Sequence, residues 1–143
     1  MLAFHWVPVK KAPVNPHILF VDDEAPIREL LSLYFRMKGF AVTTAMTGAE
    51  AMELADQNGF NLAIVDLNLA GENGLQLIGF LKSNYPKLPV IIFTGMGGTD
   101  DLAAKAQAAG ADGFMRKTES LDTLFAEVVR HLPERPELEK TAG

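Results

Sequence analysis

The sequence contains no cysteine, and this absence excludes disulfide bonds and metal sites built from thiolates. Long apolar runs are also missing, since no stretch approaches the roughly 20 residues that a membrane-spanning helix requires. Lysine and arginine are not clustered and the net charge is -5, which disfavours a nucleic-acid-binding surface. The start of the chain has no basic leader and no cleavage site of a signal peptide. We therefore expect a cytoplasmic protein that binds neither a membrane nor nucleic acid.

The 143 residues include 48% apolar and 22% charged side chains, and this length suits one domain with one core. Apolar runs of strand length alternate with helical patterns from His17 to His131. The expected strands cover residues 18–21, 40–45, 62–65, 89–93 and 111–115. Continuous apolar strands separated by helices are typical of a parallel sheet covered on both faces. We therefore predict an α/β, flavodoxin-like doubly wound fold, with five parallel strands in the order 2-1-3-4-5.

The two ends of the chain differ from the part between them. Residues 1–14 and 133–143 each contain two prolines and lack the alternating pattern. We predict that residues 15–132 form the domain, preceded by an N-terminal extension and followed by a C-terminal tail or the start of a linker.

Polar residues directly follow four of the predicted strands. Asp22 and Asp23 follow the first strand, Asp66 the third, Thr94 the fourth and Lys117 the fifth. In a doubly wound sheet the carboxyl ends of the strands share one edge, and the first and third strands are neighbours where the strand order reverses. We therefore predict that these residues form a single pocket, although they lie far apart in the sequence.

Three carboxylates in one pocket repel one another and stay ionised together only if a cation joins them. Lys117 supplies one positive charge, and Mg²⁺, a hard cation that prefers oxygen ligands, is best suited to supply the rest. A nucleophilic carboxylate, a metal ion, a lysine and a hydroxyl are the parts required for in-line phosphoryl transfer. The residues therefore predict Mg²⁺ as the cofactor and phosphoryl transfer to a carboxylate of the pocket as the chemistry.

Four stretches of the chain resemble the receiver domain of two-component response regulators (the CheY-like family). They are ILFVDDE at 18–24, DLNLAGENG at 66–74, VIIFTG at 90–95 and GADGFMRK at 110–117. Each stretch alone is modest evidence, but their order and their positions at strand ends are specific to this family. The resemblance covers residues 15–132.

The resemblance implies a role for each residue of the pocket. Asp66 would accept a phosphoryl group from a phosphohistidine or from a small donor such as acetyl phosphate, and would also be a metal ligand. Asp23 would bind Mg²⁺ directly, Asp22 largely through water, and Asn68 through its backbone carbonyl. Lys117 would pair with Asp66 and then with the phosphoryl group, with the Thr94 hydroxyl as the third catalytic group.

Thr94 and Phe114 would also form a switch pair. They would couple the phosphoryl group to the face made by the fourth helix, fifth strand and fifth helix, through which a dimer could form. Two plainer interpretations stay open at this point. An aromatic residue on a buried strand is a core residue by default, which applies to Phe114. Carboxylates after the first strand can cap the first helix, which applies to one of residues 22–24.

Three positions affect how closely the chain follows the family. Ala70 and Thr118 stand where proline is usual, after the phosphoacceptor and after Lys117 respectively. In the family the bond between the lysine and the following proline is typically cis, but a cis bond without proline costs about 2.5–4 kcal/mol. We therefore predict a trans bond between Lys117 and Thr118. We also expect the ammonium of Lys117 to stay within salt-bridge reach of Asp66. Met96 lies two residues after Thr94, and its apolar side chain cannot orient a water that attacks the phosphoryl group. We therefore expect slow autodephosphorylation after a self-catalysed phosphorylation.

The resemblance implies a signalling protein and not an enzyme with turnover. Its upstream partner would be a sensor histidine kinase or a phosphotransfer protein, and its downstream partner an effector protein or a missing output domain. A stand-alone receiver and the front part of a larger regulator both fit the chain.

Three rival functions were weighed against the phosphorylated receiver. A degenerate receiver would serve only as a docking module. An aspartyl-phosphate phosphatase of the haloacid dehalogenase type would need a second acid where the chain has Asn68, and a cap domain for which there is no room. A flavin carrier would need a hydroxyl- and glycine-rich loop after the first strand, where residues 22–24 are acidic and would repel a phosphate.

Overall fold

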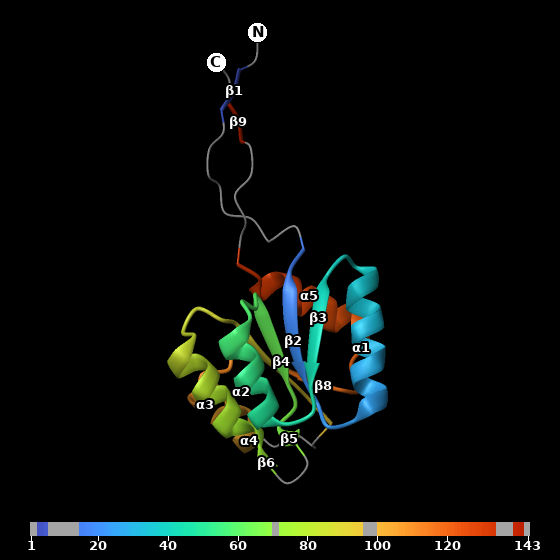
Figure 1. The fold of residues 1–143 in the computed structure, drawn as a ribbon, viewed down its shortest axis with the longest axis vertical. Helices are drawn as coiled ribbons and strands as arrows, with labels where there is room; N and C mark the ends of the chain where they lie inside the picture. Colours follow the sequence, from blue (N-terminus) through green and yellow to red (C-terminus); the bar gives the residue numbers. More distant parts are fainter. Residues whose placement is uncertain (1–2, 6–14, 70–71, 96–99, 134–138, 142–143) are drawn as a thin grey trace.

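The computed structural model describes residues 3–5, 15–69, 72–95, 100–133 and 139–141. Its central sheet has five parallel strands in the spatial order β3-β2-β4-β7-β8 (Figure 1). These strands are β2 (His17–Val21), β3 (Ala41–Ala45), β4 (Leu62–Val65), β7 (Val90–Thr94) and β8 (Gly113–Arg116). Counted along the chain within this sheet, β2, β3, β4, β7 and β8 are strands 1 to 5, so the predicted order 2-1-3-4-5 and the flavodoxin-like fold are confirmed.

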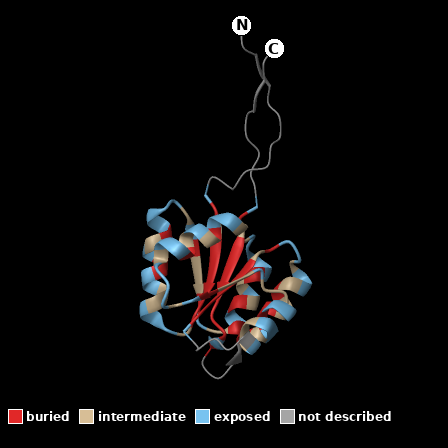
Figure 2. Ribbon diagram, turned by 180° about the vertical axis from the view of Figure 1, so that it is seen from behind, coloured by how far each residue is buried: buried red, intermediate tan, exposed pale blue. Residues whose placement is uncertain are grey.

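Five helices cover the two faces of this sheet. They are α1 (Ala25–Met37), α2 (Gly48–Gln57), α3 (Gly74–Asn84), α4 (Asp100–Ala108) and α5 (Leu121–His131). Alternate strand residues point to opposite faces, so the core has two halves. Leu19, Val65 and Ile92 pack toward α2, α3 and α4. The other half includes Phe20 and Ile64 with residues of α1 and α5. Figure 2 shows the buried strands between exposed helix surfaces.

Capping residues explain where two of the helices begin. The hydroxyl of Thr47 accepts a hydrogen bond from the backbone N–H of Glu50 at the start of α2, and Ser120 accepts one from Thr123 at the start of α5. Each hydroxyl satisfies a backbone donor that the first helical turn leaves unpaired. At the end of α1, Gly39 has φ = +89°, a conformation that glycine adopts without strain.

Two small antiparallel pairs were not predicted. Strands β5 (Asn68–Leu69) and β6 (Glu72–Asn73) pair between the expected strands 62–65 and 89–93, where no further strand was predicted. Strands β1 (Ala3–His5) and β9 (Glu139–Thr141) pair across the two predicted extensions, at a distance from the domain (Figure 1). None of the helices in the described ranges combines the length and the apolar character needed to cross a lipid bilayer.

Candidate functional site

The backbone of the site is fixed by hydrogen bonds that continue the sheet just past the ends of its strands. In each bond the N–H of a site residue donates to a carbonyl of the neighbouring strand. The bonds join Asp22 to Ala45 at 3.0 Å, Asp66 to Val21 at 2.9 Å and Lys117 to Thr94 at 2.9 Å. Because the parallel strands end at the same edge, their pairing sets the positions of the side chains that follow.

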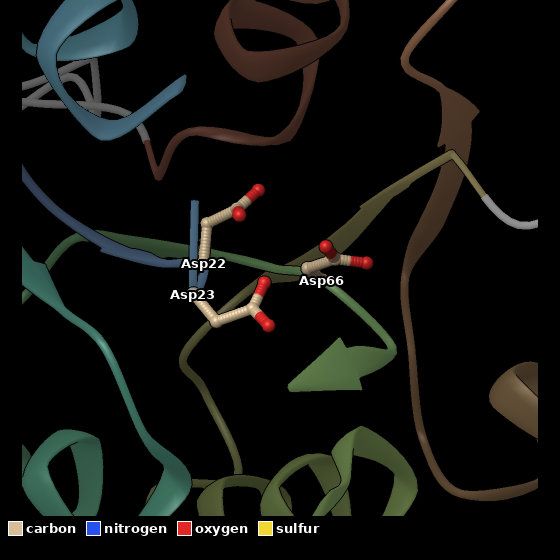
Figure 3. A group of neighbouring side chains, drawn as sticks. All are labelled: Asp22, Asp23 and Asp66. Atoms are coloured by element: carbon tan, nitrogen blue, oxygen red, sulfur yellow. The ribbon is translucent and has the colours of Figure 1, made fainter. Parts of the chain in front are cut away.

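Three carboxylates meet at this edge. Asp22 and Asp23 leave the end of β2, and Asp66 leaves the end of β4 (Figure 3). One oxygen of each side chain lies within 4.8 Å of the others. Asp22 is 0% and Asp66 3% exposed, while Asp23 is partly exposed. The structure therefore brings together the three acidic residues that the sequence placed in one pocket.

Lys117 supplies the positive charge between them. Its ammonium lies 2.7 Å from Asp22 Oδ2 and 2.8 Å from Asp66 Oδ2, to which it donates a hydrogen bond. A third carboxylate, that of Glu24, lies 3.7 Å away. No peptide bond is cis within the described ranges, so the bond between Lys117 and Thr118 is trans. Both the predicted trans bond and the predicted reach of Lys117 to Asp66 are confirmed.

Burial and charge act in opposite directions on the two buried partners. Burial raises the pKa of Asp22, and the neighbouring ammonium of Lys117 offsets this only in part. Burial lowers the pKa of Lys117, but its close contacts with the charged carboxylates of Asp22 and Asp66 outweigh that effect and raise the pKa above its ordinary value. Lys117 is therefore a permanent cation in this pocket at neutral pH.

One oxygen of the pocket has the properties expected of a cation site. Asp22 Oδ2 is buried and accepts no hydrogen bond from the described residues, because the nearby ammonium of Lys117 lies off the direction of a hydrogen bond. The ammonium of Lys117 at 2.7 Å balances the charge of this oxygen, while its hydrogen-bonding capacity is left for a metal ion or a bound water. One carboxylate oxygen from each of Asp22, Asp23 and Asp66 gives the all-oxygen ligand set that Mg²⁺ prefers.

A cavity of about 240 Å³ opens beside Asp66. It is lined by Glu24, Asp66, Asn68, Gly95 and Lys117. The N–H of Asn68 donates to Asp66 Oδ1 at 3.1 Å, so the two oxygens of Asp66 are held by different partners. The oriented carboxylate therefore faces a space into which a tetrahedral group could enter.

Thr94 and Phe114 lie on the same face of the sheet. Ile92 pairs with Phe114 and Thr94 pairs with Arg116, and residues two apart on a strand share a face. Thr94 is fully buried, whereas Phe114 is partly buried and packs against the core half that contains α4. The packing of Phe114 agrees with the core interpretation, and the switch interpretation stays a prediction.

Sequence reasoning missed two residues of the site. Glu24 was considered as a helix cap, but its side chain makes no capping hydrogen bond and approaches Lys117 instead. Gly74 at the start of α3 packs so tightly that an added Cβ would lie 2.6 Å from the backbone oxygen of Asp66. The signal for Glu24 was its place in an acidic run of three, and the signal for Gly74 was a glycine after a polar loop. Ala70 and Met96 lie outside the described residues.

Comparison with known families gives one match over most of the chain. The model of the response regulator receiver domain matches residues 18–129. The transcriptional regulatory protein GlrR of Escherichia coli is 34% identical over 109 residues, which are 76% of this chain and 24% of GlrR. The chain spans about a quarter to a half of the length of the curated relatives it matches.

Comparison with solved structures gives the same result. The response regulator TrrA of Thermotoga maritima, in complex with Mg²⁺-BeF, is similar with a TM-score of 0.74 and 29% identity, over 82% of this chain and 99% of that one. A response regulator of Burkholderia pseudomallei with a phosphorylated aspartic acid, calcium ion and citrate is similar with a TM-score of 0.74 and 28% identity, over 78% of this chain and 65% of that one.

Proposed function

The chain belongs to the response regulator receiver domain family, and we propose that Asp66 is its phosphoacceptor. The observation that carries this proposal is the position of the Asp66 carboxylate. It lies at the mouth of a cavity, beside Asp22 and Asp23, and its Oδ2 accepts a hydrogen bond from Lys117 at 2.8 Å. A phosphorylated aspartic acid in the related Burkholderia pseudomallei protein supports the same role for Asp66.

The proposed step is an in-line displacement at phosphorus. An oxygen of Asp66 forms a P–O bond while the P–N bond of a phosphohistidine breaks, and the imidazole leaves with the electron pair. Lys117 holds the carboxylate in place before the step and is positioned to pair with a phosphoryl oxygen after it. The Thr94 hydroxyl would bind another phosphoryl oxygen. Positioning and charge neutralisation carry most of the catalysis in such transfers.

The acidic residues fit the cation that this chemistry requires. Asp23 and Asp66 would hold Mg²⁺ directly, Asp22 through water, and Asn68 through its backbone carbonyl. The ion supplies positive charge that offsets the phosphoryl oxygens and the crowded carboxylates. The related protein TrrA was solved in complex with Mg²⁺-BeF, which supports Mg²⁺ as the cation.

We propose the wider biological role from the family. A sensor histidine kinase or a phosphotransfer protein would donate the phosphoryl group, and an effector protein or an output domain would respond to it, in the cytoplasm. GlrR, a transcriptional regulatory protein, is much longer than this chain. The receiver would comprise residues 15–132, flanked by the extension at 1–14 and the tail or linker at 133–143. It would act as a phosphoacceptor without turnover, with slow autodephosphorylation.

Incubation with acetyl phosphate and Mg²⁺ is expected to add one phosphoryl group to the protein, as measured by intact mass. Chelation of Mg²⁺ with EDTA should prevent the addition, because the crowded carboxylates and the incoming phosphoryl group then repel one another. In Asp23→Ala, labelling should require a higher Mg²⁺ concentration than in the unmodified protein. Absence of labelling in a folded protein would favour the docking module, and repeated release of phosphate at a substantial rate would favour the phosphatase.

Phosphorylation is expected to change amide hydrogen exchange most strongly around α4 and β8. In this proposal the Thr94 hydroxyl moves toward the phosphoryl group and Phe114 occupies the space that it leaves, which shifts a pre-existing equilibrium. Exchange should be compared with and without beryllofluoride and Mg²⁺, with α2 as the internal reference. Equal protection of α4 and β8 in both states would contradict a role for Thr94 and Phe114 as a switch pair.

A further inference from the structure

A second cavity lies between α1 and the edge strand β3, apart from the acidic pocket. It measures about 390 Å³, and its lining includes Arg28, Ser32 and Arg36 of α1 together with Thr44 of β3. The three α1 residues are spaced four apart, so they form one stripe along the helix. The volume is within the range of small-molecule sites in proteins.

Both arginines in this groove are held by the backbone and lack an acidic partner. Arg28 Nη1 donates to the carbonyl of Asp22 at 2.7 Å, and Arg36 Nη2 donates to the carbonyl of Val42 at 3.1 Å. Each bond uses one of the five guanidinium donors. Among the described residues no carboxylate lies within ion-pair distance of either guanidinium, although Glu29 also lines the groove. Two unpaired guanidiniums in one groove are unexpected in a chain with a net charge of -5.

Ser32 is the second independent feature. Its side chain lies between the two arginines and is 7% exposed, and its hydroxyl makes no hydrogen bond to the described residues. The hydroxyl is not one of the fully buried polar atoms that lack a partner, so it is open to the groove. Because Ser32 lines the groove, this hydroxyl is available to a bound ligand.

We propose that the groove between α1 and β3 binds a small molecule that carries phosphate groups. The planar forks of Arg28 and Arg36 match the geometry of phosphate oxygens, and each fork is already fixed by a backbone carbonyl. The hydroxyl of Ser32 would donate a further hydrogen bond to the same ligand. This site is separate from Asp66 and requires neither Mg²⁺ nor phosphorylation.

The probe for this site is pyrophosphate, added to ¹⁵N-labelled protein in EDTA at constant ionic strength. We expect saturable amide shifts confined to α1 and β3. Arg36→Gln should weaken binding at least about tenfold, because a charge-assisted pair is lost. Arg36 is substituted and not Arg28, because the loss of the hydrogen bond from Arg28 to the carbonyl of Asp22 could disturb the acidic pocket. Arg130→Gln, which removes an exposed arginine of α5 outside the groove, is the matched control and should bind like the unmodified protein.

Two further arms make the result decisive. Arg36→Lys keeps the charge but loses the planar fork, so it should bind with intermediate affinity and serves if Arg36→Gln does not fold. A hexaglutamate peptide and vesicles of phosphatidylserine in phosphatidylcholine test whether the groove takes an acidic segment or a membrane instead. The proposal is wrong if the peptide or the vesicles saturate the groove while pyrophosphate does not. It is also wrong if the amide shifts with pyrophosphate do not saturate, or if Arg36→Gln and Arg130→Gln bind pyrophosphate equally.

Discussion

Asp66→Asn is expected to yield a folded protein that takes up no phosphoryl group from acetyl phosphate and Mg²⁺. Asparagine has nearly the same shape, so the packing at the end of β4 should persist. Its amide is not a nucleophile and carries no charge to attract Mg²⁺ or to pair with Lys117. The intact mass should therefore stay unchanged under conditions that label the unmodified protein.

The stability of this variant carries a second expectation. Asp22 and Asp66 share the ammonium of Lys117, and Asp23 lies beside them, so removing one carboxylate relieves repulsion in a buried site. The free energy of unfolding in urea without Mg²⁺ should not decrease, and loss of labelling then cannot be attributed to unfolding. Asp101→Asn is the matched control, because Asp101 is an exposed residue of α4 that pairs with Lys105. Full labelling of Asp66→Asn, or an equal loss in Asp101→Asn, would rule out Asp66 as the phosphoacceptor.

The fold could be predicted because strands that are buried on both faces appear in the sequence as continuous apolar runs. Every residue of β4 and β7 is buried, and both strands appear in the sequence as unbroken apolar runs. A strand that is covered on both faces must come from a parallel sheet between helix layers, and few strand orders are then available. The small pairs β1–β9 and β5–β6 left no such trace. Each of these strands is only two or three residues long, which is too short to show an alternating apolar pattern in the sequence.

The residues of the acidic site could be predicted from the sequence, but the contacts between their side chains could not. Topology alone placed Asp22, Asp23, Asp66 and Lys117 at one edge of the sheet. It could not show that Lys117 lies between two carboxylates, or that Asp22 Oδ2 stays without a hydrogen bond, because these depend on side-chain conformation. The approach of Glu24 to Lys117 was hidden for the same reason.

The close approach of Gly74 to the backbone of Asp66 and Leu67 supports a prediction about stability. An added Cβ at this position would lie 2.6 Å from the backbone oxygen of Asp66 and 2.8 Å from the Cα of Leu67. Backbone atoms cannot move aside as the end of a flexible side chain can. The N–H of Gly74 also donates to the carbonyl of Leu67 at 3.1 Å, which ties the start of α3 to the same loop.

We therefore expect Gly74→Ala to lower the free energy of unfolding by about 2 kcal/mol or more, because the start of α3 or the Asp66 loop must shift. Gly79→Ala in the same helix is the matched control, since nothing lies within 4 Å of its added Cβ. It should raise the stability by about 0.5–1 kcal/mol through the better helix propensity of alanine. Urea unfolding measures both changes. Labelling by acetyl phosphate should slow only in Gly74→Ala, where the backbone of Asp66 is displaced. Equal stability of the two variants would show that the contact between Gly74 and Asp66 relaxes freely and does not hold the site in place.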